Sequence, residues 1–171
     1  YFEILQRDIP WRHDEAVIFG KHIITDREVA WYGDTSYNYG YSGANRIALP
    51  WDGVLPELKN RVEAAIADIC PTRFNSCLLN RYNNGNEGMA WHSDEGQGLV
   101  KDSAIASLSL GATRKFAFKH KESKEKREMW LEHGQLIVMH GETQKHWLHT
   151  ILKSTRIQEP RINLTFRVMK E

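Results

Sequence analysis

The chain of 171 residues is 41% hydrophobic, which is enough for one sizeable core, so we expect a single domain over residues 1–171. Its net charge of +1 excludes the global basic excess that by itself marks a nucleic-acid-binding protein, so any such binding must come from local patches. Two cysteines, no signal-peptide pattern and no apolar run as long as a membrane span predict a reducing, intracellular setting, although a removed segment before Tyr1 stays open.

The strongest helical signal covers residues 56–70. Leu58, Val62 and Ile66 recur there at helical spacing, and Pro56 suits a first-turn position. Short alternating segments separated by turn residues then predict strands at 76–82, 89–92, 104–110, 115–120, 135–139 and 161–169. We expect a charged loop at residues 119–127. Many short strands after one helix favour an α+β protein with a β-sandwich or jelly roll supported by helices.

The last predicted strand has two chemically different faces. Because side chains alternate along a strand, Ile162, Leu164 and Phe166 point to one side. The opposite side carries Arg161, Asn163, Thr165 and Arg167. Two arginines are costly to bury unless an anion pairs with them, so this face predicts an anion-binding pocket.

A second pattern predicts a metal site. His92 and Asp94 are two residues apart at the end of a predicted strand, which places an imidazole and a carboxylate on the same face. Two histidines and one carboxylate leave three positions of an octahedron open, as in non-haem Fe(II) oxygenases. From spacing alone, the third ligand stays open among His133, His140, His146 and His149.

Taken in order, these residues resemble the AlkB family of Fe(II)- and 2-oxoglutarate-dependent dioxygenases. The family patterns H-x-D, a distal His, R-x-N-x-x-x-R and an earlier N-x-Y are matched by His92 and Asp94, His149, Arg161, Asn163 and Arg167, and Asn80 and Tyr82. The resemblance to the duplex-DNA-repair branch selects His149, which precedes Arg161 by 12 residues and closes an H-W-x-H segment. His146 is then expected to be a hydrogen-bonded structural histidine.

The resemblance implies a double-stranded β-helix, or jelly-roll, core with supporting helices and an N-terminal substrate-binding lid. Residues 1–55 would form mainly the lid and residues 56–171 the helix and core. It implies Fe(II), 2-oxoglutarate and O2 as cofactor and cosubstrates. We expect Arg167, with Tyr82 and Thr165, to bind the C5 carboxylate of 2-oxoglutarate. Arg161 would pair with Asp94 and the C1 carboxylate at the iron end, and Asn80 and Asn163 would hydrogen-bond the cosubstrate.

The resemblance also implies residues that contact the substrate. A base inside a duplex is out of reach, so it must be flipped or unpaired. The substrate-binding candidates are Phe19, Gly20, Lys21, Tyr39, Tyr41 and Glu95, with the His92 ring. Phe19 would fill the gap in the base stack, and Tyr39, Tyr41 and His92 would sandwich the base. Tyr41 replaces a usual phenylalanine and Glu95 a common aspartate. The charged loop at 119–127, extended by Arg81, Arg114 and Lys115, is a candidate phosphate-contacting patch.

The implied activity is oxidative demethylation of N1-methyladenine and N3-methylcytosine in DNA, with RNA left open, releasing formaldehyde, succinate and CO2. Hydroxylation of a protein or a tRNA base by the same chemistry is the first alternative. The second is a non-catalytic module stabilised by a structural metal, which lacks the fourth ligand that closes structural zinc sites. We expect a monomer with a nucleic-acid partner and no membrane association, cytoplasmic in a bacterium and nuclear in a eukaryote.

Overall fold

The computed structural model describes residues 1–41 and 44–171, and the side chains of residues 38–46 are not described. In chain order the elements are α1 (Phe2–Asp8), β1 (Arg12–Ile18), β2 (Lys21–Gly33), β3 (Asn38–Tyr41), β4 (Ala44–Ile47), β5 (Leu49–Pro50), α2 (Leu55–Ile66), β6 (Ser76–Tyr82), β7 (Met89–His92), β8 (Ile105–Gly111), β9 (Arg114–His120), β10 (Lys126–Leu131), β11 (Leu136–Met139), α3 (Thr143–His146), β12 (Trp147–Ile151) and β13 (Arg161–Arg167). No helix in these ranges is long and apolar enough to cross a membrane.

The larger sheet places β13 at its centre. Its strand order is β1-β2-β6-β13-β8-β11, and β5 pairs with β2 at the side. β13 runs antiparallel to both of its neighbours, so that Arg161 lies opposite Tyr82 on β6 and Gly111 on β8. Asn163 lies opposite Asn80 in the same register. The polar face of β13 therefore adjoins the N-x-Y residues of β6.

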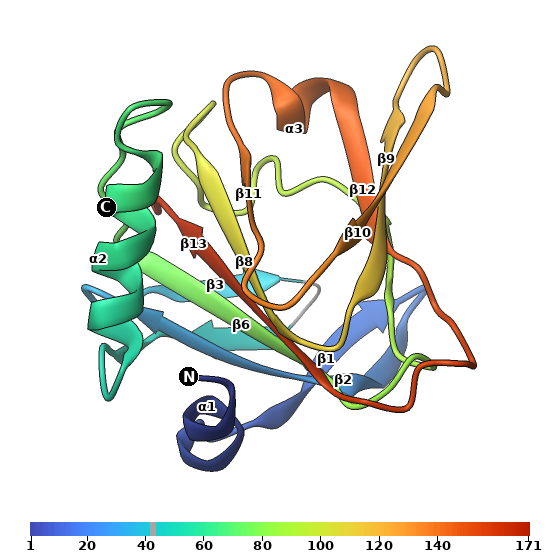
Figure 1. Ribbon diagram of the computed structural model, residues 1–171, viewed down its shortest axis with the longest axis horizontal. Helices are drawn as coiled ribbons and strands as arrows, with labels where there is room; N and C mark the ends of the chain where they lie inside the picture. The colour runs from blue at the N-terminus through green and yellow to red at the C-terminus, as the bar shows by residue number, and fades with distance from the viewer. Residues whose placement is uncertain (42–43) are drawn as a thin grey trace.

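The smaller sheet faces the larger one and has the order β10-β9-β12-β7. In Figure 1, β9, β10 and β12 lie across the molecule from α2, with β13 and β8 between them. Apolar side chains from both sheets meet in the space between them, among them Tyr82, Phe116, Leu131 and Ile151. Two facing antiparallel sheets with helical support confirm the predicted jelly-roll core.

The helices α1 and α2 cover the outer face of the larger sheet. Leu58, Val62 and Ile66 on α2 share one buried cluster with Ile162 and Leu164 on β13, and Leu5 of α1 joins the same cluster. Figure 1 shows α2 lying along this face. The helices thus cover the apolar side of β13, and its polar side faces the interior between the sheets.

Several predicted element boundaries need correction. The helix ends at Ile66 rather than at Cys70, and Ile69, which matched the helical spacing, is 70% exposed. The predicted charged loop at 119–127 is the turn of a hairpin, because Lys126 on β10 pairs with Lys119 on β9. The predicted strands after residue 75 otherwise agree with the structure to within two residues. Sequence reasoning missed α1, the strands before α2, and β10, α3 and β12.

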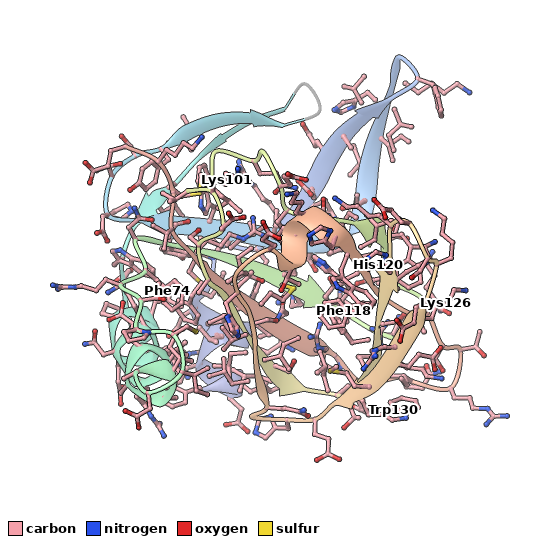
Figure 2. The ribbon with its side chains drawn as sticks, turned by 90° about the horizontal axis from the view of Figure 1, so that it is seen from above. Phe74, Lys101, Phe118, His120, Lys126 and Trp130 are labelled. Carbon is pink, nitrogen blue, oxygen red and sulfur yellow. The ribbon has the colours of Figure 1, made fainter. Side chains whose placement is uncertain are left out.

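β1 and β2 form a long antiparallel hairpin whose tip is Phe19 and Gly20. Figure 2 shows the blue end of this hairpin projecting beyond the rest of the molecule. Phe19 adopts φ 48° and Gly20 φ 75°, which a tight turn between two strands requires. The base of the hairpin continues into the larger sheet, because β2 also pairs with β6. That residues 1–55 serve as a lid stays a prediction.

Candidate metal centre and anion pocket

Two strands of the smaller sheet bring the predicted metal ligands together. His92 ends β7 and lies directly opposite His149 on β12, and their ring centroids are 4.2 Å apart. Asp94 Oδ1 lies 3.8 Å from His92 Nε2, and Asp94 Oδ2 lies 3.6 Å from His149 Nε2. One ligand atom from each of the three side chains lies within 4.8 Å of the others. The arrangement can hold one divalent ion.

Hydrogen bonding prepares two of these groups for a cation. His92 Nδ1 lies 2.7 Å from the carbonyl oxygen of Ala90, which can only accept, so Nδ1 carries the proton and the Nε2 lone pair faces Asp94. The backbone N–H of Asp94 donates to Gln144 Oε1 at 2.8 Å, which ties the loop after β7 to α3. The His92 ring and the backbone at Asp94 are therefore held in place before a metal binds.

Burial and charge keep these groups in the protonation states that a metal needs. Burial disfavours ionisation of Asp94, but the charges of Arg167, His149 and His92 outweigh it, and the pKa of this carboxyl is lowered. Burial lowers the pKa of His149 to about 4, although the charge of Asp94 opposes the shift. A carboxylate thus lies beside a neutral imidazole at neutral pH. His149 Nδ1 is buried without a hydrogen-bond partner.

Arg161 forms the other end of the pocket. It is 1% exposed, and NH2 donates a hydrogen bond to Ser109 Oγ at 2.9 Å, while Nε and NH1 have no partner. Burial lowers the pKa of Arg161 to about 10, so the guanidinium is still charged at neutral pH. The described residues supply no carboxylate to this cation. A buried cation with unpaired donors requires an anion, which fits a ligand carboxylate at this point.

Tyr82 provides a further donor beside Arg161. Its ring lies 5.6 Å from the Arg161 guanidinium carbon, and its hydroxyl donates to Met89 Sδ at 3.9 Å. A thioether is a weak acceptor, so this hydroxyl is available to a better one. Arg161, Tyr82 and the His-Asp-His cluster line one pocket, so an anion held at one end would reach the metal position at the other.

The predicted pairing of Arg161 with Asp94 is wrong. Arg167, not Arg161, lies beside Asp94, with NH2 3.4 Å from Oδ1. Arg161 lies beside Tyr82 at the opposite end of the pocket. The spacing along β13 correctly predicted two separate charges, but the direction of β13 relative to the His-x-Asp segment depends on the sheet pairing, which spacing does not reveal.

The remaining polar side chains of β13 are held by neighbours on the same sheet. Asn163 Nδ2 donates to Ser107 Oγ at 2.6 Å, and Thr165 Oγ1 donates to Asn163 Oδ1 at 3.0 Å. Asn80 Oδ1 accepts from Arg27 NH1 at 2.5 Å. Sequence reasoning missed Ser107 and Ser109, although the alternation in residues 104–110 carried the signal that both face the side opposite to the core.

A groove of about 570 Å³ opens beside this pocket, between the β1–β2 hairpin and β7. Its size lies within the usual range of ligand clefts, roughly 300–1,000 Å³. His92, Asp94 and Arg167 line both the groove and the pocket, so a molecule in the groove would reach the metal position. Thr25 and Trp91 also line it.

Among the described side chains, the other predicted substrate residues do not line the groove. Phe19 is 101% exposed at the hairpin tip, and Lys21, which begins β2, is also exposed. Glu95 points to Lys121, whose Nζ lies 3.4 Å from Oε2. The side chains of Tyr39 and Tyr41 lie outside the described part, as do Ser42 and Gly43 entirely.

The three residues expected to extend the phosphate patch are buried or paired with carboxylates. Arg114 is fully buried and donates to the carbonyl oxygens of Asn84, Glu87 and Leu152, so it cannot contact a phosphate at the surface. Arg81 pairs with Glu28 at 2.7 Å and stacks on Trp11. Lys115 is also paired, with Glu128.

His146 is confirmed as a hydrogen-bonded histidine, because its Nε2 lies 3.1 Å from Glu142 Oε2.

Comparisons with known proteins agree with this geometry. The family model described as the 2OG-Fe(II) oxygenase superfamily matches residues 2–167. The chain is 37% identical over 158 residues to DNA oxidative demethylase ALKBH2 of Mus musculus, covering 88% of this chain and 64% of that protein. It is 37% identical over 181 residues to alpha-ketoglutarate-dependent dioxygenase alkB homolog 3 of Bos taurus, covering 98% of this chain and 60% of that protein.

The chain therefore spans about three fifths of the length of these curated relatives. Among solved structures, an oxidoreductase of the 2OG-Fe(II) oxygenase family from Burkholderia pseudomallei superposes with a TM-score of 0.65 at 17% identity, covering 97% of this chain and 76% of that one. OsALKBH1 superposes with a TM-score of 0.63 at 17% identity, covering 83% of this chain and 78% of that one. Both structures support the fold alone.

Proposed function

Because the chain belongs to the 2OG-Fe(II) oxygenase superfamily, and within it to the AlkB family, we propose that it is an oxidative demethylase of alkylated nucleobases. The proposed substrates are N1-methyladenine and N3-methylcytosine in DNA, with RNA as a further substrate. The reaction consumes 2-oxoglutarate and O2 and releases succinate, CO2 and formaldehyde. The observation that carries the proposal is a buried arginine with unpaired donors at one end of a pocket that has a His-Asp-His cluster at the other.

His92, Asp94 and His149 are the proposed Fe(II) ligands. Their donor set, two imidazoles and one carboxylate, suits non-haem Fe(II), which when bound supplies the oxygen activation that the reaction needs. The lowered pKa of His149 and of Asp94 favours the metal-binding form of each side chain. Arg167 pairs with Asp94 through Oδ1, the oxygen that also faces His92, and limits the movement of this carboxylate.

The cosubstrate is proposed to lie along β13. Arg161 and the Tyr82 hydroxyl bind its C5 carboxylate, because both carry donors with no strong acceptor. Asn80, Asn163 and Thr165 line the middle of the same pocket and orient the molecule by hydrogen bonds. The keto acid end then lies at the metal, beside Asp94 and Arg167. Burial of this pocket keeps water away from the reacting end.

The groove beside the metal centre is proposed to receive the base. The residues implied by the family resemblance are Tyr39, Tyr41 and the His92 ring as stacking partners and Glu95 as a polar contact. His92 lines both the groove and the pocket, which supports a stacking role for its ring. The methyl group of a base stacked there would point toward the metal position.

The β1–β2 hairpin is proposed to hold the nucleic acid open. Phe19 is fully exposed on a turn flanked by further exposed apolar side chains, with Ile18 48% and Ile24 61% exposed. An apolar wedge of this kind can enter a base stack where a base has been extruded. Gly20 and Lys21 would allow a close backbone approach and contact a phosphate. Residues 1–55 would therefore act mainly as a substrate-binding lid of a monomeric enzyme.

Reconstitution tests the proposal directly. Protein supplied with Fe(II), ascorbate, 2-oxoglutarate and air should convert an oligonucleotide containing N1-methyladenine to the unmethylated form, which mass spectrometry detects as the loss of one methylene. Succinate should form in equal amount. Succinate formation that ignores the methylated oligonucleotide would favour a protein or tRNA-base hydroxylase instead, and no 2-oxoglutarate turnover with any nucleic acid would favour a metal-stabilised binding module.

A further inference from the structure

A buried polar chain connects the β1–β2 hairpin to the pocket. Arg27 on β2 donates from NH2 to Asp14 Oδ2 at 2.8 Å and from NH1 to Asn80 Oδ1 at 2.5 Å. Asp14 is 7%, Arg27 9% and Asn80 5% exposed. Neither the Arg27 nor the Asp14 side chain belongs to the family motif or to the metal centre. Their burial nevertheless requires a reason, because removing two charges from water is costly.

The backbone places the first member of this chain in an irregular position. The register of β1 against β2 shifts between His13 and Glu15, so Asp14 lies opposite a bulge formed by residues 25–27 of β2. A bulge redirects a side chain that would otherwise follow the alternation of the strand. Here the bulge contains Arg27, whose guanidinium donates to the Asp14 carboxylate, and both side chains line the groove.

The last member of the chain faces the pocket. Asn80 lies opposite Asn163 on β13, and both line the pocket with Tyr82 and Arg161. An amide side chain has one acceptor end and one donor end, and a guanidinium only donates. Arg27 therefore fixes Oδ1 of Asn80 toward itself and Nδ2 away from itself. Across the described side chains, no acceptor is found for this Nδ2.

We propose that Arg27, anchored by Asp14, is a positioning residue that fixes the Asn80 amide so that Nδ2 donates to an oxygen of bound 2-oxoglutarate. The inference rests on the proposed function, in that it needs 2-oxoglutarate in this pocket. Without the guanidinium the amide is free to rotate, and half of its orientations present an oxygen to a dianion. The geometry of the hairpin bulge is thereby linked to affinity for the cosubstrate.

Arg81 offers a matched control. It lies next to Asn80 on β6 and pairs with Glu28 on β2 at 2.7 Å, so it joins the same two strands as Arg27 does. Its guanidinium stacks on Trp11 and does not line the pocket. Arg27→Lys and Arg81→Lys each keep the charge and lose the planar fork. A general effect on the sheet should appear in both variants, and a positioning effect only in the first.

The experiment is a calorimetric titration of 2-oxoglutarate into full-length protein loaded with Mn(II), under argon and without nucleic acid. We expect Arg27→Lys, Asp14→Asn and Asn80→Ala each to weaken 2-oxoglutarate binding by roughly tenfold, the loss of one hydrogen bond to a charged group. Mn(II) affinity and the unfolding temperature of Arg27→Lys should match those of Arg81→Lys. The variant Arg27→Lys with Asn80→Ala should bind no more weakly than Asn80→Ala alone.

Additive losses in the double variant would overturn the inference, because they would mean that Arg27 acts independently of Asn80. Equal losses in Arg27→Lys and Arg81→Lys would overturn it as well. If the unsubstituted protein bound Mn(II) but not 2-oxoglutarate, the proposed function itself would be wrong. Asp14→Asn keeps the Arg27 guanidinium. It therefore tests whether Arg27 positions the Asn80 amide even if Arg27→Lys fails to fold.

Discussion

The Arg167 guanidinium lies 3.4 Å from the Asp94 carboxylate, and both groups are almost fully buried where the metal position meets the groove. Arg161, at the other end of the same strand, has Nε and NH1 without partners. Arg167, although its Nε also lacks a partner, thus pairs with a carboxylate of the protein, whereas Arg161 has no carboxylate among the described residues. This division underlies the first two predictions.

Asp94→Ala and His149→Ala should abolish demethylation and metal binding while the protein stays folded. Each substitution removes one of three ligand side chains, and two ligands hold a divalent ion far more weakly than three. Mn(II) binding followed by electron paramagnetic resonance measures the loss, and circular dichroism checks the fold. His146→Ala is the control, because His146 is paired with Glu142 away from the cluster, and it should bind Mn(II) normally. Normal Mn(II) affinity in Asp94→Ala would exclude this residue as a ligand.

Arg161→Met should raise the KM for 2-oxoglutarate by about 10- to 100-fold, the range for a lost hydrogen bond to a charged group. The same change should erase discrimination against 2-oxovalerate, which lacks the distal carboxylate, because Arg161 is proposed to bind that group alone. Competition between the two acids, measured by succinate formation, reports the ratio. A variant that still strongly prefers 2-oxoglutarate would move the carboxylate site elsewhere.

Phe19→Ala should slow repair of duplex DNA and leave repair of single-stranded DNA nearly unchanged. A wedge is useful only where a base must leave an intact stack, and the side chain makes no buried contact that its loss would disturb. We expect the free energy of unfolding to stay within about 0.5 kcal/mol. Trp130→Ala, which removes another exposed aromatic from β10, is the control. Equal slowing on both DNA forms would argue against a wedge.

Replacing Lys121, Lys124 and Lys126 with alanine should flatten the salt dependence of DNA binding. The three lysines lie on the β9–β10 hairpin; Figure 2 shows His120 and Lys126 together on this side of the molecule. Each lost phosphate contact should reduce the slope of log affinity against log salt concentration by about one. Fluorescence anisotropy over a salt series measures the slope. An unchanged slope would show that these lysines contact no phosphate, as expected if Lys121 serves only to hold Glu95 and Gln144.

Much of the site followed from local patterns. The alternation in residues 161–167 correctly separated Ile162, Leu164 and Phe166, which pack under the helices, from the polar residues that line the pocket. Alternation is a property of the extended backbone itself, so it needs no knowledge of neighbours. The His-x-Asp spacing likewise placed two ligands on one face, and the family resemblance selected His149 from four candidates.

Pairing between distant segments decided the rest. Arg167 rather than Arg161 lies beside Asp94, because strand order and register set which end of β13 meets Asp94. These depend on contacts between residues far apart in the chain. The Asp14–Arg27–Asn80 chain depends on a bulge and on three strands, so the pattern of a single segment could not predict it. The amino-acid sequence alone determined which side chains share a face, through the period of the backbone, whereas only the tertiary structure determined which charges meet, because long-range packing brings them together.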